Sequence, residues 1–381
     1  MTSKIYRLSE ARELRGYTVA EFAEKIGVTR QAVYKYEGGT QRPNNELMDK
    51  IVEVLNFPLS FFMKPHVGMQ LDERPIFFRD MKTDLKKNRN IARRWIYLLV
   101  DRVAEYEKYL ELPEDHLPQL EICDFKDLSD EDIDNYAEQT RRYWNLGDGP
   151  ISDLTLLLEN NGVIVAHKDV LSPKLDACSM IFNGRPYILV NTHKQTCSRV
   201  LMNLAHELAH IVLHQGITIE DIEKKETLNV IEKQAKRFAA SFLMPPAVFS
   251  NEVGYPSLSQ FLLLKKRWRT SIASMIMHSR AIGLISEERK QYFFRELSRS
   301  GWRKKEPLDD ELPIEKSSLL FECEKTIVDS GLELKDTLYQ NSSLSRKDYI
   351  ELISAPDNYF IEERKKPNLR LLNPNTSGAS N

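Results

Sequence analysis

Two histidines and a glutamate stand at a spacing suited to metal-assisted hydrolysis. His206, Glu207 and His210 form an HExxH pattern within the stretch 199–214. Residues four apart lie on one face of an α-helix, so both imidazoles can bind a single Zn²⁺. Glu207, one position on, can then reach a water molecule beside the ion. The pattern predicts a zinc hydrolase site, and the alternative is a pair of ordinary hydrogen-bonded histidines on a helix.

A catalytic zinc ion needs a third protein ligand and an open position for water. We expect Glu232 to supply that ligand, because it borders the apolar stripe of a predicted helix over 226–244. A carboxylate beside a buried face is costly without a partner, and a metal ion compensates it. The alternative is a surface glutamate at the edge of the stripe. Glu226 lies on another face of the same helix and is the weaker candidate.

His214 is a less suitable ligand, although it lies on the same predicted helix as the HExxH pattern. It follows His206 by eight residues, which corresponds to about 12 Å along a helix axis. One ion cannot bind both residues with His210 between them. We expect His214 to pack beside the site or to support a ligand from behind.

The elements that must hold these residues follow from hydrophobic periodicity and turn residues. An amphipathic helix over 151–160 precedes an apolar strand at 163–166, and residues 178–191 indicate two strands joined at Gly184 and Arg185. We expect the strand over 186–191 to form an edge of the sheet and to pair with an extended substrate. Helices are then predicted over 198–214, 226–244, 257–285 and within 311–365.

The N-terminal segment has the pattern of two short helices joined by a tight turn. Thr18, followed three residues later by Glu21, predicts a capping box at the start of a helix. Gly27 permits the left-handed turn that ends this helix, and Thr29 caps the next helix over 30–37.

The second of these helices presents polar and basic side chains suited to DNA. The candidate DNA contacts on this helix are Arg30, Gln31, Tyr34 and Lys35. Arg42, which follows the Gly-Gly turn, is a further candidate. Such side chains reach base edges and phosphates in a major groove. The alternative is a helical bundle used for protein contacts, since residues 1–64 carry a net charge of only +2.

The composition of the whole chain excludes several classes of protein. The 381 residues hold 54 Lys and Arg against 56 Asp and Glu, so a DNA-binding surface has to be local. No apolar run approaches the length of a membrane span, and the first residues lack the apolar core of a signal peptide. The four cysteines, Cys123, Cys178, Cys197 and Cys323, form no CxxC pair, which argues against a thiolate zinc site. We therefore expect a cytoplasmic protein without a membrane partner.

Charge changes sign between two neighbouring segments. Residues 79–108 carry nine Lys/Arg against five Asp/Glu and indicate a basic helix. Residues 111–138 carry eleven Asp/Glu against a single lysine and indicate an acidic connector followed by a helix. Solvated helix surface is the ordinary interpretation of both segments.

These patterns resemble two known families. The frame Thr-x-x-Glu-x-Ala-x-x-Ile-Gly-Val-Thr at 18–29, with Tyr-Glu-Gly-Gly and Pro43 after it, is similar to the phage-repressor (XRE/Cro) helix-turn-helix family over residues 5–63. The blocks that resemble the ImmA/IrrE metallo-endopeptidase family are Phe77-Phe78-Arg79, the HExxH stretch, 232–245, 271–285 and Gly301-Trp302-Arg303. Together the two resemblances extend over about residues 5–305.

The resemblance implies roles for the candidate residues. His206, His210 and Glu232 match the zinc ligands of the ImmA/IrrE family, and Glu207 matches its catalytic glutamate. In the helix-turn-helix family, the outward positions of the second helix read bases. Two positions depart from the ImmA/IrrE pattern, with Ala209 where glycine is usual and Lys236 where asparagine is usual.

We expect an α+β fold that is mostly α. The predicted organisation is an all-α helix-turn-helix DNA-binding domain (1–64), a basic then acidic helical connector (65–150), a zincin-like peptidase domain with a small mixed sheet (151–305), a C-terminal helical region (306–366) and a disordered tail (367–381).

The combination predicts a zinc-dependent endopeptidase that carries its own DNA-binding domain, with Zn²⁺ as cofactor. The resemblance implies a cytoplasmic regulator as substrate, such as a phage-type repressor or an antitoxin, which is cut to control gene expression. The alternative is a DNA-binding transcriptional regulator whose metal-binding domain is a sensor or scaffold without proteolytic turnover. The expected partners are the protein substrate and double-stranded DNA. Whether the protein forms a homodimer is left open. Repressor-type domains often dimerise, but no pattern in this sequence indicates an interface.

Overall fold

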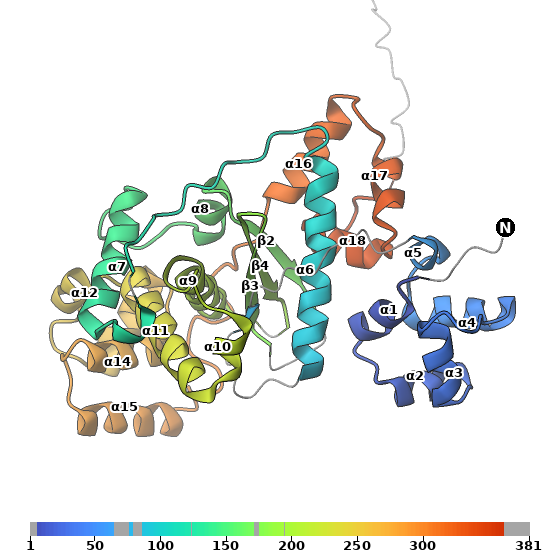
Figure 1. Ribbon diagram of the computed structural model, residues 1–381. Helices are drawn as coiled ribbons and strands as arrows, with labels where there is room; N and C mark the ends of the chain where they lie inside the picture. Colours follow the sequence, from blue (N-terminus) through green and yellow to red (C-terminus); the bar gives the residue numbers. More distant parts are fainter. Residues whose placement is uncertain are drawn as a thin grey trace, which may run out of the picture.

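The fold is mostly helical and contains one small mixed sheet, as expected for the α+β class (Figure 1). The computed structural model describes residues 6–64, 76–78, 86–122, 124–170, 175–193 and 195–361. The tail predicted over 367–381 lies outside the described residues. Among the described residues, no helix combines the length and the apolar character of a membrane span.

Five short helices form the N-terminal bundle, namely α1 (Leu8–Leu14), α2 (Val19–Ile26), α3 (Arg30–Glu37), α4 (Asn45–Leu55) and α5 (Leu59–Met63). The predicted capping box is present, because the Thr18 side chain accepts from the backbone of Glu21 and the Glu21 side chain accepts from the backbone of Thr18. Gly27 ends α2 with φ 77°, and the Thr29 side chain caps α3. Local capping therefore produces the helix, turn and helix expected from the sequence.

The sheet has four strands in the order β1-β3-β4-β2. They are β1 (Phe77–Phe78), β2 (Ile164–Lys168), β3 (Ala177–Phe182) and β4 (Arg185–Asn191). β4 pairs antiparallel with β3 and parallel with β2. The expectation that residues 186–191 form an edge is therefore wrong, because β4 lies between β3 and β2, and β2 is the edge strand. β1 lies at the other edge, antiparallel to β3.

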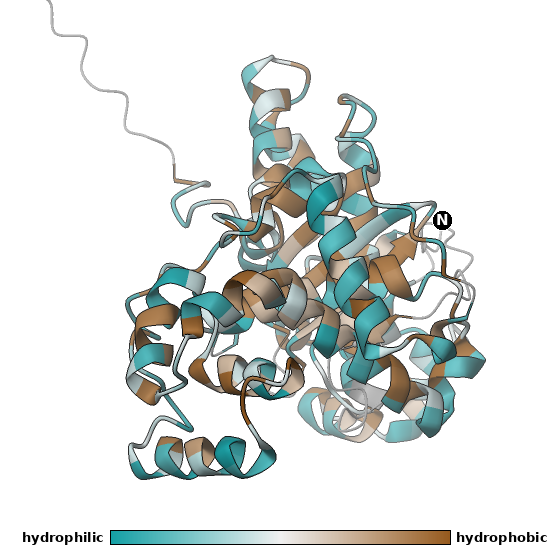
Figure 2. Ribbon diagram, turned by 90° about the vertical axis from the view of Figure 1, so that its left-hand side faces the viewer, coloured by the Kyte–Doolittle hydropathy of each residue, from teal (hydrophilic) through white to brown (hydrophobic). Residues whose placement is uncertain are grey.

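Helices cover both faces of the sheet. α6 (Lys86–Tyr106) packs on one face, and α9 (Cys197–Leu213) packs on the other with α11 (Lys225–Leu243) beside it (Figure 1). Alternate residues along the strands face opposite sides of the sheet. Met180 and Leu189 pack in the apolar cluster that contains α6, whereas Ile188 and Val190 pack in the cluster that contains α9. The strands and the helices around them accordingly carry strongly hydrophobic stretches (Figure 2).

The acidic segment fixes the position of α11. After the short turn η1 (Phe125–Asp127), it forms α7 (Asp130–Tyr143), which packs along α11. Arg237 of α11 pairs with Asp130 at 2.8 Å and with Asp134 through its Nε at 3.0 Å. Part of this acidic segment is therefore in contact with basic side chains and is not simply solvated surface.

The region after α11 contains more helix breaks than predicted. Its helices are α12 (Pro246–Val253), α13 (Leu258–Trp268), α14 (Ile272–Ala281) and α15 (Glu287–Arg299); α8 (Leu154–Asn160) and α10 (Ile219–Glu223) lie earlier in the chain. A single helix over 257–285 is wrong, because Arg269 adopts φ 54° and Ser271 caps a new helix. Glu306 accepts from the backbone of Ile272 and Ala273, which stabilises the second start.

The C-terminal helices are α16 (Leu319–Asp329), α17 (Lys335–Ser342) and α18 (Arg346–Ile353). They pack on α6 and on β2, so α6 contributes to a continuous core although the sequence suggested a connector there. Two carboxylates hold the segment that leads to the C-terminal helices. Glu315 of that segment accepts from Leu154 and Thr155 at the start of α8, and Glu159 of α8 accepts from Leu319 at the start of α16.

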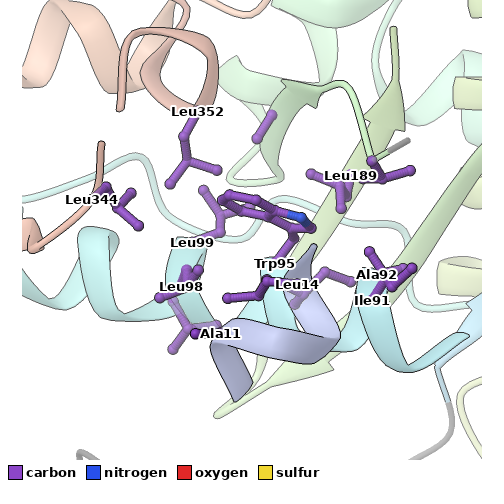
Figure 3. Packing of buried hydrophobic residues seen from close by; sticks show 14 of the residues in the cluster. Ala11, Leu14, Ile91, Ala92, Trp95, Leu98, Leu99, Leu189, Leu344 and Leu352 are labelled. Atoms are coloured by element: carbon purple, nitrogen blue, oxygen red, sulfur yellow. The ribbon is translucent and has the colours of Figure 1, made fainter. Parts of the chain in front are cut away.

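The N-terminal bundle docks on this core through α1. Leu14 lies beside Trp95 of α6, which is 1% exposed, and Ala11 lies near Leu98 of the same helix (Figure 3). Arg15 also pairs with Asp348 of α18, at 2.5 Å. The bundle is thus joined to the body of the protein by a buried apolar contact and an ion pair.

Replacing Trp95 tests this junction. We expect Trp95→Ala to lower the free energy of unfolding by about 3–5 kcal/mol, because it leaves a cavity between α1, α6 and the C-terminal helices. Chemical denaturation followed by circular dichroism measures the change. Leu156→Ala, at a side chain that is 46% exposed, is the control and should stay within about 0.5 kcal/mol. Equal losses in the two variants would contradict the packing role.

Candidate metal centre and DNA-binding face

α9 carries the HExxH pattern through the middle of the protein. The Thr196 side chain caps the helix, and the residues from Asn203 to Leu213 are all buried. His206 and His210 are 1% and 0% exposed. A helix buried on all sides holds its side chains in defined rotamers and keeps bulk water away from them.

Glu232 of α11 meets the two histidines. The Nε2 atoms of His206 and His210 lie 3.1 Å apart, and each lies 3.6 Å from Glu232 Oε1. The three residues are buried. Among the described residues they form the one group of His, Cys, Asp or Glu side chains that could hold a metal ion. Glu226, the weaker candidate, is exposed.

The spacing of these atoms suits a tetrahedral metal ion. Ligands at about 2.0–2.1 Å from Zn²⁺ and at tetrahedral angles are about 3.3 Å apart. The separations of 3.1 to 3.6 Å bracket that value. Two neutral imidazoles and one carboxylate are also a donor set of catalytic zinc sites. The residues present therefore fit a zinc ion.

A chain of hydrogen bonds fixes the proton of His210. The amide nitrogen of Gln234 donates to the backbone oxygen of Phe125, so its oxygen accepts from His214 Nε2, at 3.0 Å. Burial lowers the pKa of His214 well below its usual range, so this ring is neutral. Its Nδ1 then accepts from His210 Nδ1, at 2.9 Å. The lone pair of His210 is left on Nε2, the atom that faces Glu232.

Glu232 is held in its charged form. Burial alone would raise its pKa, but when His206 and His210 are protonated their hydrogen bonds and charge outweigh burial and hold the pKa far below its usual range. With both rings neutral, a bound cation would supply the same positive charge. Its second oxygen, Oε2, lies 3.5 Å from Lys236 Nζ. The lysine that stands where the ImmA/IrrE pattern has asparagine thus contacts the carboxylate from the solvent side.

Glu207 lies on the same helix but is oriented by the sheet. It is fully buried, and its Oε2 accepts a hydrogen bond from Ser179 Oγ of β3, at 2.6 Å. A carboxylate held in this way has a fixed direction beside the paired histidines. It can take a proton from a water molecule that attacks a substrate carbonyl.

Some residues of this centre were not found by sequence reasoning. Ser179 and Gln234 carry no motif, and their roles depend on strand pairing and on the packing of α11 against α9. Phe77 belongs to a block that resembled the ImmA/IrrE family, but its place beside His210, with ring centroids 4.6 Å apart, follows only from the sheet. The supporting role expected for His214 agrees with its hydrogen bonds.

The second candidate surface lies on the N-terminal bundle. α3 buries Val33 and Tyr36, and Ala32 is half-buried. All five candidate DNA contacts are exposed, namely Arg30, Gln31, Tyr34, Lys35 and Arg42. The outward side of the helix is therefore available to a DNA groove.

Comparison with known proteins agrees with both parts of the structure. Residues 8–62 match the helix-turn-helix family model, and residues 159–277 match the model described as IrrE N-terminal-like domain. The chain is 34% identical over 68 residues to an SPbeta prophage-derived uncharacterized HTH-type transcriptional regulator of Bacillus subtilis, covering 18% of this chain and 63% of that protein. An uncharacterized HTH-type transcriptional regulator of Sinorhizobium medicae is 34% identical over 62 residues, which cover 16% of this chain and 45% of that protein.

The chain spans less than two thirds of the length of each of these relatives, and both likenesses are short. The match to the IrrE N-terminal-like model, over residues 159–277, includes both histidines of the HExxH pattern and Glu232. The protein therefore joins an XRE-type helix-turn-helix domain to a domain of the ImmA/IrrE-like peptidase family.

Proposed function

We propose that the protein is a zinc-dependent endopeptidase that also binds double-stranded DNA. The observation that carries the proposal is the meeting of His206, His210 and Glu232 in a buried site, with Glu207 held beside them. In this proposal, residues 1–64 bind DNA and residues 151–305 carry out catalysis.

The chemistry divides between the ion and the protein. Zn²⁺, held by the three ligands, would supply the Lewis acidity that lowers the pKa of water and polarises a carbonyl. Glu207 accepts the proton of the attacking water and returns it to the leaving amine. Ser179 directs that carboxylate, and the hydrogen bonds behind His210 keep its Nε2 lone pair available.

The substrate class follows from joining a peptidase to a gene-regulatory domain. We propose a DNA-associated regulator, such as a phage-type repressor or an antitoxin, whose cleavage changes gene expression. The site of action is the cytoplasm, where such regulators bind their operators. Binding to a two-fold symmetric operator would require two copies of the chain, one for each half-site.

A non-proteolytic regulator is the second candidate, because both relatives are named as transcriptional regulators. In that case the metal centre is a sensor or a scaffold. Glu207→Ala separates the two functions, since it leaves the three ligands in place. A biological output that survives this substitution favours the sensor.

The first prediction concerns metal binding. We expect His210→Ala to lose stoichiometric zinc, and His214→Ala to lower zinc affinity about 10–100-fold, because the support behind a ligand is removed. Elemental analysis of protein purified without chelator and competition with a chelating dye measure both effects. His116→Ala, at an exposed histidine, should retain zinc. A full complement of zinc in His210→Ala would contradict the ligand assignment.

The second prediction concerns turnover. Glu207→Gln should lower cleavage of the cognate regulator by about 10²–10⁴-fold, since the amide cannot accept the proton of the attacking water. Co-expression with the product of the adjacent gene, followed by mass spectrometry of fragments, measures cleavage. Zinc content and DNA binding of this variant should match those of the wild type. Equal fragment yields in both proteins would exclude the proposed peptidase.

The third prediction concerns DNA. Arg30→Ala should weaken binding by about 1–3 kcal/mol and relax the preference at one base position, because an arginine on the outer face of α3 reads a base edge. The probe is a duplex that the wild type selects from a random-sequence library, measured by anisotropy at two salt concentrations. Lys108→Ala, at a lysine outside the bundle that is 61% exposed, is the control. If Arg30→Ala binds the duplex as tightly as the wild type, Arg30 does not read a base.

A further inference from the structure

β1 occupies the edge of the sheet beside the metal centre. It pairs antiparallel with β3, with Phe77 opposite Ser179 and Phe78 opposite Cys178. Residues directly opposite each other share a face of the sheet. Phe77 therefore lies on the same face as Ser179, whose hydroxyl binds Glu207.

The ring of Phe77 fills the space next to a candidate ligand. It stacks on His210 at a centroid distance of 4.6 Å and an interplanar angle of 8°, and it is 7% exposed. The small cavity that remains there is lined by this ring, by His210 and by apolar side chains that include Ile181, Ile211 and Ile217. An aromatic or large aliphatic side chain is thus the natural occupant of this position.

An open strand edge is also where an extended peptide adds to a sheet. The backbone of the peptide pairs with the edge, and its alternate side chains enter pockets on one face. Ser179 of β3 binds Glu207, and Phe77, its partner on β1, stacks on His210, so a peptide paired with β3 would lie beside the proposed base and one candidate ligand. In the structure described here, residues of the chain itself take that place.

We propose that β1 is an internal substitute for the substrate strand, and that the protein is self-blocked until β1 leaves. The inference rests on the proposed function and names its substrate class: an extended peptide that places an aromatic or large apolar residue where Phe77 now lies. Within the described residues the pairing of β1 with β3 covers Phe77 and Phe78, so a peptide that pairs along more of β3 can displace it.

Binding of a peptide probe tests the proposal without requiring turnover. The probe is a fluorescein-labelled Arg-Pro-Ile-Phe-Phe-Arg peptide, and the protein is the zinc-loaded full chain carrying Glu207→Gln. Adding Phe77→Ala should tighten binding about tenfold, because the site no longer has to be vacated first. A probe with both phenylalanines replaced by alanine should bind more weakly to the same variant.

Phe182→Ala is the matched control. Phe182 lies on β3, the strand that β1 pairs with, and it is three residues from Ser179, so it lies on the opposite face of the sheet from Phe77. Its removal tests general loosening of the sheet and should leave probe affinity within about twofold of the parent. Melting temperature and zinc content, measured for each variant, establish that the compared proteins are folded and loaded.

A reversible lock provides the second measurement. Phe78→Cys places a thiol opposite Cys178, and directly opposed residues of antiparallel strands have Cα separations of about 4.5–5.5 Å, which suit a disulfide. Oxidation should form the cross-link, identified by peptide mapping, and abolish probe binding. Reduction should restore it.

Two results would overturn the inference. One is a folded, zinc-loaded Phe77→Ala protein that binds the probe no more tightly than its parent. The other is a cross-linked Phe78→Cys protein that still binds it. Neither depends on cleavage, so failure of the peptidase proposal, seen as fragments that persist in Glu207→Gln, is a separate outcome.

Discussion

The meeting of one buried carboxylate with two imidazoles is the constraint on which this structure depends. Glu232 would be costly to bury alone, and its pKa is held down by His206 and His210. The three residues belong to α9 and α11, so these helices must lie side by side within a narrow tolerance. The extensive packing of α11 against α9 and α7 provides that alignment.

Charge and hydrogen bonding outside the centre maintain the same alignment. Arg237 joins α11 to the acidic α7, and Gln234 joins it to His214 and to the backbone at Phe125. Ser179 connects the sheet to Glu207. Each element that borders the site thus also orients one of its side chains. Displacement of a single helix would disturb both the ligand set and the base.

The body of the protein is continuous from the DNA-binding bundle to the metal centre. α1 packs on Trp95 of α6, and α6 covers the face of the sheet opposite α9. β1, whose Phe77 stacks on His210, lies in the sequence between α5 of the bundle and α6. The edge strand beside the metal centre is therefore flanked in sequence by the N-terminal bundle on one side and by the core helix α6 on the other.

Features that depend on neighbours in sequence were accessible from the residues alone. The HExxH spacing, the caps at Thr18 and Thr29 and the left-handed Gly27 are local, because a helix places residues four apart together whatever surrounds it. The strand pair around Gly184 is also local, because a tight turn joins two strands that are adjacent in sequence. The apolar stripe also indicated Glu232 as a ligand, since a carboxylate beside it needs a partner.

Tertiary structure decided what depends on contacts between distant segments. The order β1-β3-β4-β2 put residues 186–191 inside the sheet, since nothing local states which strand β2 chooses. The start of α14 after the break at Arg269 is stabilised by Glu306, a residue distant in sequence that accepts from the backbone of Ile272. Ser179, Gln234 and Phe77 acquired their places at the centre in the same way. Pairing and packing act through space, and a one-dimensional pattern carries their outcome only where the spacing of a helix or a turn encodes it.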